Sequence, residues 1–331
     1  MKQRLSTEEY AAGVAAGDRI ILAKAISLAE SSLPEDQEQA LALISKLTPS
    51  KNSIRIGITG VPGVGKSTFI EAFGKYITSL NKKLAVLTID PSSQVTKGSI
   101  LGDKTRMDEL SKNPLAFIRP TASGNTLGGT ASKTRESILL CEAAGYDVIL
   151  VETVGVGQSE TSVKNLVDFF LLLMLAGAGD ELQGIKKGIM EMADTILITK
   201  ADGDNLKRAR EAQADYQHAL NLFSDNQSGW KPNVLTCSAL NGTGIREVWH
   251  TIELFRDQLT QNGYMDVQRN AQRITAFHES FEQLLKNELS KFPGLQEKAE
   301  ALEEQVAKLG LPPHRAAAEL ITLYREAIKK S

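Results

Sequence analysis

The spacing of hydrophobic residues divides the chain into three stretches. In residues 7–48 apolar positions recur every three or four residues, with a Ser-Ser-Leu-Pro break at 31–34, which predicts a small group of helices. Residues 53–261 instead alternate short apolar runs with helix-length segments that have one polar face. Beyond residue 262 only helical spacing returns, and the helices there have apolar stripes that need a partner surface.

The short apolar runs of the middle stretch predict strands. They are 54–58, 84–89, 116–118, 148–151, 169–175, 196–198 and 234–236. Strands that alternate with helices form a mostly parallel sheet covered by helices on both faces, so the predicted fold class is α/β. We expect an N-terminal helical segment (1–50), an α/β domain (51–261) and a C-terminal helical arm (262–331), which either packs on its own domain or forms a dimer.

Composition narrows the functional classes. The chain has 331 residues, of which 42% are hydrophobic and 24% are charged, with a net charge of -2 and no long basic stripe, so we expect no nucleic-acid partner. The N-terminus has no apolar stretch, and no apolar run approaches the ~20 residues needed to span a bilayer. We therefore expect a cytoplasmic protein without a membrane partner. Cys141 and Cys237 lie among apolar residues and predict buried thiols.

A glycine-rich segment directly follows the first predicted strand and precedes an amphipathic helix. Its residues match G-x-x-x-x-G-K-[ST]: Gly60, Val61, Pro62, Gly63, Val64, Gly65, Lys66, Ser67 and Thr68. In this context the glycines let the backbone curl so that its N–H groups point at phosphate oxygens. Lys66 is expected to contact the β- and γ-phosphates, and Ser67 to offer its hydroxyl to Mg²⁺. The motif predicts a nucleoside triphosphate as ligand.

Carboxylates follow two other predicted strands. Asp90 ends the second strand and Glu152 the fourth, where ligands of parallel sheets collect, and oxygen ligands at such places can hold Mg²⁺. Asp103, in a loop, is a weaker candidate. Gly155, three residues after Glu152, is placed to meet the γ-phosphate through its N–H, whereas Gln158 either orients a water or is a surface amide.

A third pair of motifs predicts which base is bound. Thr199-Lys200-Ala201-Asp202 closes the sixth strand and resembles the Asn-Lys-x-Asp signature of GTPases, with Thr199 in place of the asparagine whose amide usually braces the base pocket. The Asp202 carboxylate can accept from guanine N1–H and the 2-amino group together, and adenine does not offer this pattern. Lys200 can lie along the base. Ser238-Ala239-Leu240 resembles the loop that meets guanine O6.

Taken together, these motifs resemble the MeaB/ArgK family of P-loop GTPases, and the likeness covers nearly the whole chain. The segments that carry it are Gly60–Thr68, Asp90–Ser93, Gly102–Met107, Glu152–Glu160 and Gly179–Glu191. The resemblance implies a homodimeric GTPase that converts GTP to GDP, joined through its C-terminal helices. It also implies a chaperone that protects adenosylcobalamin-dependent methylmalonyl-CoA mutase and gates its cofactor loading.

The resemblance also implies roles for residues. Mg²⁺ would be held by Ser67, Asp90, Asp103 and Glu152. The loop from Asp180 to Lys187 would be an extra switch, ordered by the mutase. Lys186, or else Lys187, would then stabilise charge on the transferred phosphoryl group, alongside the catalytic groups Lys66, Glu152 and Asp180.

Two other classes of protein share the phosphate loop. A metallochaperone GTPase would carry His or Cys clusters, whereas the four histidines here are scattered. A transport-associated ATPase or kinase would use ATP and would have no need of Asp202. A preference for guanine over adenine nucleotides distinguishes the second class from a GTPase.

Overall fold

The computed structural model describes residues 5–50, 52–89, 107–121, 127–153, 159–177, 187–223, 227–292 and 294–328. The chain forms two compact units, Met1–Gln272 and Arg273–Ser331.

The α-helices are α1 (Thr7–Ala15), α2 (Arg19–Glu30), α3 (Pro34–Lys46), α4 (Lys66–Ser79), α6 (Leu127–Ala143), α7 (Ser159–Lys164), α8 (Lys187–Met192), α9 (Leu206–Leu220), α10 (Ile245–Gln261), α11 (Tyr264–Lys291), α12 (Leu295–Leu309) and α13 (Pro313–Ile328). Two short 3₁₀ helices are η1 (Leu110–Lys112) and η3 (Gly203–Asn205).

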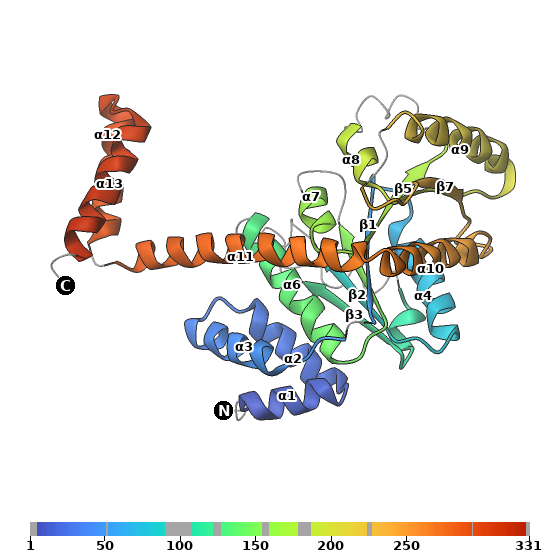
Figure 1. Cartoon of the computed structure of the whole chain (residues 1–331), viewed down its shortest axis with the longest axis horizontal. Coiled ribbons are helices and arrows are strands. Elements are labelled where there is room, and N and C mark those ends of the chain that lie inside the picture. The colour runs from blue at the N-terminus through green and yellow to red at the C-terminus, as the bar shows by residue number, and fades with distance from the viewer. Residues whose placement is uncertain are drawn as a thin grey trace. The chain divides into compact units, whose positions relative to one another are not determined.

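The first unit is built on a seven-stranded sheet. Its strands are β1 (Ile54–Gly60), β2 (Leu84–Ile89), β3 (Ala116–Thr121), β4 (Val148–Thr153), β5 (Phe169–Leu175), β6 (Thr195–Thr199) and β7 (Asn233–Thr236). Their order across the sheet is β3-β2-β4-β1-β5-β6-β7, and every pair is parallel. Figure 1 shows the sheet between α6 and α4. The predicted parallel α/β sheet is therefore confirmed, with β1 near its centre.

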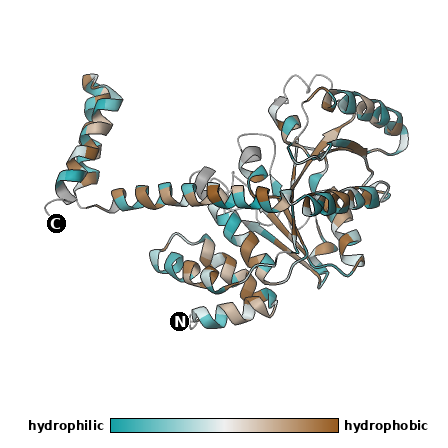
Figure 2. Cartoon of the chain, viewed as in Figure 1, coloured by the Kyte–Doolittle hydropathy of each residue, from teal (hydrophilic) through white to brown (hydrophobic). Residues whose placement is uncertain are grey.

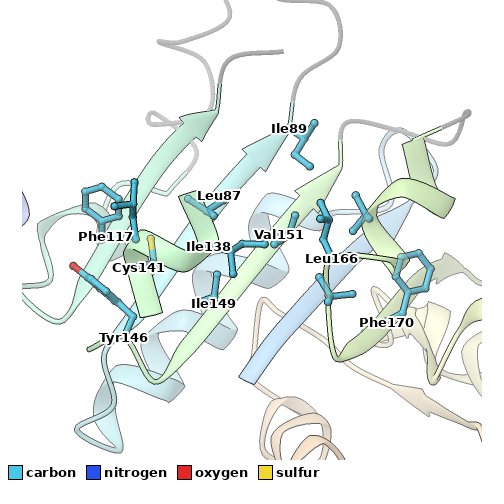
Figure 3. Close-up of a cluster of buried hydrophobic side chains, with 14 of the residues drawn as sticks. Leu87, Ile89, Phe117, Ile138, Cys141, Tyr146, Ile149, Val151, Leu166 and Phe170 are labelled. Carbon is cyan, nitrogen blue, oxygen red and sulfur yellow. The ribbon is translucent and has the colours of Figure 1, made fainter. Parts of the chain in front are cut away.

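Each face of the sheet has its own hydrophobic core. On one face side chains of β2, β4 and β5 pack with α6, α7 and α9; Figure 3 shows part of this core, with Ile138 and Cys141 of α6 against Leu87 and Ile149 of the sheet. On the other face β1, β4 and β5 pack with α4 and α10, and the ring of Phe169 on β5 makes a T-shaped contact with that of Phe255 on α10. Burial on both faces explains why the strands are almost uninterrupted apolar runs (Figure 2).

Ion pairs with buried carboxylates lie at the amino ends of the strands. Arg55 on β1 forms two hydrogen bonds with Glu142 of α6, at 2.7 and 2.8 Å. Arg269 of α11 forms two with Asp168, at 2.8 and 2.7 Å, and Asp168 also accepts the backbone N–H of Arg55 at 2.9 Å. These charges tie strands to helices at the edge opposite the predicted phosphate loop.

The predicted N-terminal helices form as α1 to α3 and pack on α6. Ser6 and Glu9 exchange side-chain and backbone hydrogen bonds that cap α1, and the predicted break separates α2 from α3. In the second unit α12 and α13 pack together, with the rings of Phe292 and Tyr324 in edge-to-face contact at 5.1 Å. Within the described ranges, no helix combines the length and the apolar character needed to cross a bilayer.

Candidate nucleotide-binding site

The predicted phosphate loop connects β1 to α4 at the carboxyl edge of the sheet. Gly63 and Gly65 have φ of +78° and +95°, the left-handed region that a side chain disfavours, and Gly65 caps the amino end of α4. Gly60 is required for a different reason, because a Cβ there would lie 2.5 Å from the carbonyl oxygen of Leu173 on β5. The sequence thus makes a curled loop whose amides and helix N-terminus favour an anion.

The Lys66 ammonium lies inside this loop. Its Nζ donates to the carbonyl of Gly60 at 2.8 Å and to that of Val61 at 3.4 Å. Burial lowers the pKa of Lys66, and the carboxylate of Glu152 acts in the opposite direction. The loop therefore holds a partly desolvated cation where a phosphate would bind.

Glu152 lies next to the loop, at the end of β4. Leu150 faces the core beneath α4, and the alternation of side chains along a strand places Glu152 on that same face. Its side chain is 5% exposed, and it lies opposite Ile58 of β1 in the sheet register. Behind it, Thr153 donates a 2.8 Å hydrogen bond to Thr59, which joins the ends of β4 and β1. Glu152 and Ser67, the half-buried second residue of α4, are oxygen donors of the type that Mg²⁺ prefers.

The end of β6 is hydrogen-bonded to Gly63 and Val64 of the phosphate loop. The Thr199 hydroxyl donates to the carbonyl of Val64 at 2.7 Å, and the Lys200 ammonium donates to that of Gly63 at 2.9 Å. Lys200 has a φ of +55°, a conformation that only a few per cent of non-glycine residues adopt. Thr199 lacks the amide that the usual signature has at this position, as the sequence predicted. Its hydroxyl instead donates a hydrogen bond to the phosphate loop.

Asp202 and the segment after β7 form the other half of the site. The Ser238 hydroxyl donates to Oδ2 of Asp202, which fixes the carboxylate, and Ser238 itself is fully buried. Ala239 is half-buried and Leu240 is 82% exposed. The turn needs glycine at 244, because its φ is +82° and a Cβ would lie 2.2 Å from the carbonyl of Thr236. The structure thus brings the two predicted base-recognition segments together.

The two cysteines are buried, as predicted. Cys237 precedes Ser238, and burial, with a smaller contribution from the Asp202 charge, raises the pKa of its thiol to about 12. A thiol with so high a pKa stays protonated at neutral pH and is a poor nucleophile. Cys237 therefore packs beside the site and is not a reacting group.

Several predicted residues lie outside the described residues. They are Asp90, Asp103, Gly155, Gln158, Asp180 and Lys186; Lys187 is the first residue of α8. In the part of the chain that is described, no three His, Cys, Asp or Glu residues cluster as a metal site.

Sequence reasoning missed two contacts of the site. One is the hydroxyl pair of Thr59 and Thr153, and the other is the bond from Thr199 to Val64. The signal for both was a threonine at the last or next-to-last position of a buried strand, where a hydroxyl needs a partner. The partner itself was not readable, because Thr199 and Val64 are 135 residues apart.

Known proteins resemble the chain over most of its length. The model of the family described as methylmalonyl-CoA mutase-associated GTPase MeaB matches residues 22–293. A GTPase named ArgK from Escherichia coli is 49% identical over 274 residues, covering 82% of this chain and 83% of its own. A probable GTPase of Mycobacterium tuberculosis is 46% identical over 319 residues, covering 96% and 95%.

A mouse protein and a protein of known crystal structure are also similar to this chain over most of its length. The mitochondrial methylmalonic aciduria type A homolog of Mus musculus is 41% identical over 335 residues, covering 98% of this chain and 81% of its own. The crystal structure of an LAO/AO transport system kinase has a TM-score of 0.76 at 37% identity and covers 98% of this chain and 99% of its own. The phosphate loop, the base-recognition segments and these relatives agree, and the chain is a guanine-nucleotide-binding GTPase that belongs to the MeaB family.

Proposed function

We propose that this GTPase acts as a chaperone of adenosylcobalamin-dependent methylmalonyl-CoA mutase, protecting the enzyme and gating the loading of its cofactor. The observation that carries the proposal is the match of residues 22–293 to a family described by its association with that mutase. The mouse relative, named for methylmalonic aciduria, supports the same metabolic setting. GTP binding and hydrolysis would then time the interaction with the mutase.

The site residues divide into a phosphate half and a base half. Residues Gly60 to Thr68 would cradle the phosphates, and the Lys66 ammonium would exchange its carbonyl partners for β- and γ-phosphate oxygens. Asp202, oriented by Ser238, would accept from the guanine edge, with Lys200 along the base plane and Ala239 and Leu240 beside it. Because phosphoryl transfer depends chiefly on positioning and charge stabilisation, this division needs no covalent intermediate.

Mg²⁺ fits the described oxygen donors. Ser67 and Glu152 would hold it directly or through water, and Asp90 and Asp103 are further predicted ligands. When bound, the ion would neutralise charge on the β- and γ-phosphates. Glu152 would in addition keep Lys66 protonated, since its charge favours the ammonium.

A loop that responds to the mutase would complete the catalytic site. In the proposal Lys186, with Lys187 as the alternative, brings a cation to the transferred phosphoryl group when the mutase binds Asp180 to Lys187. Hydrolysis would then be slow in the isolated protein and faster in the complex.

Phosphate release from GTP, measured with and without the purified mutase, tests the chaperone proposal. We expect the mutase to raise the rate, and Lys186→Ala to remove this stimulation, while Lys207→Ala on the exposed face of α9 keeps it. A rate that does not change at saturating mutase would contradict the proposal. Loss of mutase activity during turnover should also slow when the GTPase and GTP are present.

The second unit supports the proposed homodimer. On α11 the residues Ile274, Phe277, Phe281 and Leu284 are 57–65% exposed, and they are separated by three, four and three positions. This is the spacing of a coiled-coil seam, and aromatic side chains so exposed favour contact with a second copy. Phe277→Lys combined with Phe281→Lys should yield monomers in light scattering, and a dimer that persists would place the interface elsewhere.

A kinase is the second candidate, because a related crystal structure is named as a transport system kinase. A kinase would transfer the γ-phosphoryl group to a protein hydroxyl or carboxylate, whereas a GTPase transfers it to water. With GTP labelled on the γ-phosphate, label recovered as inorganic phosphate favours hydrolysis, and label bound to protein favours the kinase.

A further inference from the structure

The chain has two Asn-Gly pairs, and they lie at the two ends of α10. Asn241-Gly242 belongs to the connection from β7 to α10, and Asn262-Gly263 follows α10 directly. In each pair the asparagine side-chain oxygen accepts the backbone N–H two residues further on, from Thr243 at 3.1 Å and from Tyr264 at 2.9 Å. Both pairs are exposed, and their glycines have φ of +77° and +75°. The two pairs therefore have the same local conformation.

The pairs differ in the hydrogen bonds of two nitrogen atoms. The side-chain amide of Asn262 donates to the carbonyl of Ser228 at 2.9 Å, and the backbone N–H of Gly263 donates to that of Thr260 at 3.2 Å. Among the residues that the structure describes, neither the side-chain amide nitrogen of Asn241 nor the backbone N–H of Gly242 has a hydrogen-bond partner. Only the pair before α10 thus has both nitrogens free.

These two nitrogens take part directly in deamidation, the reaction that makes asparagine thermolabile. The backbone nitrogen of the following residue loses its proton and attacks the side-chain carbon Cγ, which closes a five-membered imide and releases ammonia. Water then opens the imide at either carbonyl and leaves aspartate or isoaspartate. Glycine presents no side chain to hinder the attack. The reaction consumes one water and needs no other reactant, and a nitrogen held in a hydrogen bond must first be released.

The turn around Asn241 also supports the segment that is proposed to recognise the base. The backbone N–H of Ser238 donates to the carbonyl of Thr243 at 2.9 Å, which closes a loop that contains Asn241. The Asn241 N–H donates to the Ser238 hydroxyl at 3.4 Å, and this hydroxyl in turn donates to Asp202. An isoaspartate at position 241 would insert one more main-chain atom into the closed loop, so Ser238 could no longer hold Asp202 in the same place.

We propose that Asn241 is a modification site, at which the chain deamidates spontaneously and thereby loses affinity for guanine nucleotides. The site of modification follows from the two free nitrogens of the Asn241-Gly242 pair. The effect on binding rests on the proposed contact of Asp202 with the base. The Asn262-Gly263 pair serves as an internal reference, because it shares the turn, the exposure and the glycine conformation.

The rate of modification is tested on the full chain, kept in warm, mildly alkaline buffer and sampled over time by peptide mapping. Two hydrogen bonds must open at Asn262 and none at Asn241, so Asn241 should convert roughly 5-fold to 100-fold faster. A rate at Asn241 that is equal to or lower than that at Asn262 would overturn the proposal. So would an Asn241 that stays intact while a synthetic peptide of residues 239–245 converts completely.

Asn241→Ser is the matched variant for the effect on binding. The serine hydroxyl can accept the Thr243 N–H as the asparagine oxygen does, and it has no amide to lose. Freshly purified, this variant should bind GDP as the wild type does. After the same incubation the wild type should lose GDP binding in proportion to its isoaspartate at position 241, and Asn241→Ser should keep it. An equal loss in both proteins would refute the effect on binding, and the mapped conversion rates would show separately whether Asn241 is modified.

Discussion

The two edges of the sheet are built on different principles. At the amino ends of the strands, buried carboxylates pair with cations that are at least partly buried: Glu142 with Arg55, Asp168 with Arg269, and Asp194 with Lys164 at 2.6 Å. At the carboxyl ends, the Lys66 ammonium donates to the main-chain carbonyls of Gly60 and Val61 in the glycine-rich phosphate loop. One edge satisfies its charges internally, and the other keeps polar groups that a charged ligand can satisfy.

This difference separates stability from binding. A buried charge whose partner is removed costs about 3–5 kcal/mol, so the amino edge should govern the free energy of unfolding. At the carboxyl edge the partner of the charge is the nucleotide, so changes there should act on affinity and turnover. Substitutions made at each edge of the sheet therefore test this separation.

Arg269→Met should lower the free energy of unfolding by about 3–5 kcal/mol, because Asp168 would stay buried without its bidentate partner. Urea denaturation measures this change. The control is Arg256→Met, which breaks the exposed pair of Arg256 with Asp257 and should change stability by about 0–1 kcal/mol. Equal effects of the two variants would refute the special role of the amino edge.

Lys66→Ala should reduce GTP turnover by about 10²–10³-fold, since it removes one preorganised cation from the phosphate site. Steady-state phosphate release measures the loss. Lys75→Ala on the exposed side of the same helix, where the lysine pairs with Glu109, should keep full turnover. Undiminished activity of Lys66→Ala would disprove the phosphate-loop assignment.

Asp202→Asn should shift preference from guanosine to xanthosine triphosphate, because the amide can donate to the 2-oxo group that replaces the 2-amino group. The lost charge-assisted bonds predict a change of roughly 1.5–3 kcal/mol in relative affinity. Competition binding with the two nucleotides measures it, and Asp204→Asn, an exposed carboxylate two residues away, is the control. An unchanged preference for guanine would argue against the base pocket.

Nucleotide binding should be accompanied by proton uptake at alkaline pH. Burial lowers the pKa of Lys66 in the free protein, while a bound triphosphate favours the ammonium and raises that pKa again. Affinity should therefore fall as the pH rises through the lowered pKa, in the range below 10.5. Calorimetry in buffers of different ionisation enthalpy measures the uptake, and Lys66→Arg should lose it because a guanidinium stays protonated. Binding with no proton uptake at any alkaline pH would contradict the prediction.

The sequence predicted the carboxyl edge better than the amino edge. Gly60 to Thr68 and Asp202 stand in short motifs whose chemistry is local, so their roles could be argued from spacing. The pairs at the amino edge join residues that are 30, 87 and 101 positions apart in the sequence, and hydrophobic periodicity does not predict such pairs. A charged residue inside or beside an apolar run, as with Arg55 and Asp168, was the available signal.

The C-terminal helices show the same limit. Their existence and approximate bounds follow from helical spacing, and α11 to α13 lie where that spacing predicts them. The proposed domain boundary at residue 261 rests on the disappearance of strand patterns. The first compact unit continues to Gln272, because the beginning of α11 is hydrogen-bonded to the turn before β5, a contact that periodicity does not reveal.

That contact determines where the chain can be shortened. Gln268 and Gln272 both donate to the carbonyl of Val167, and Arg269 donates to that of Ser53 at 2.6 Å as well as to Asp168. A polypeptide that stopped after Gln261 would leave these acceptors exposed to solvent or unsatisfied beneath the sheet. A polypeptide that continued through Gln272 would keep the hydrogen bonds that the beginning of α11 makes to the first unit. Expression trials of the isolated nucleotide domain should therefore use that end point.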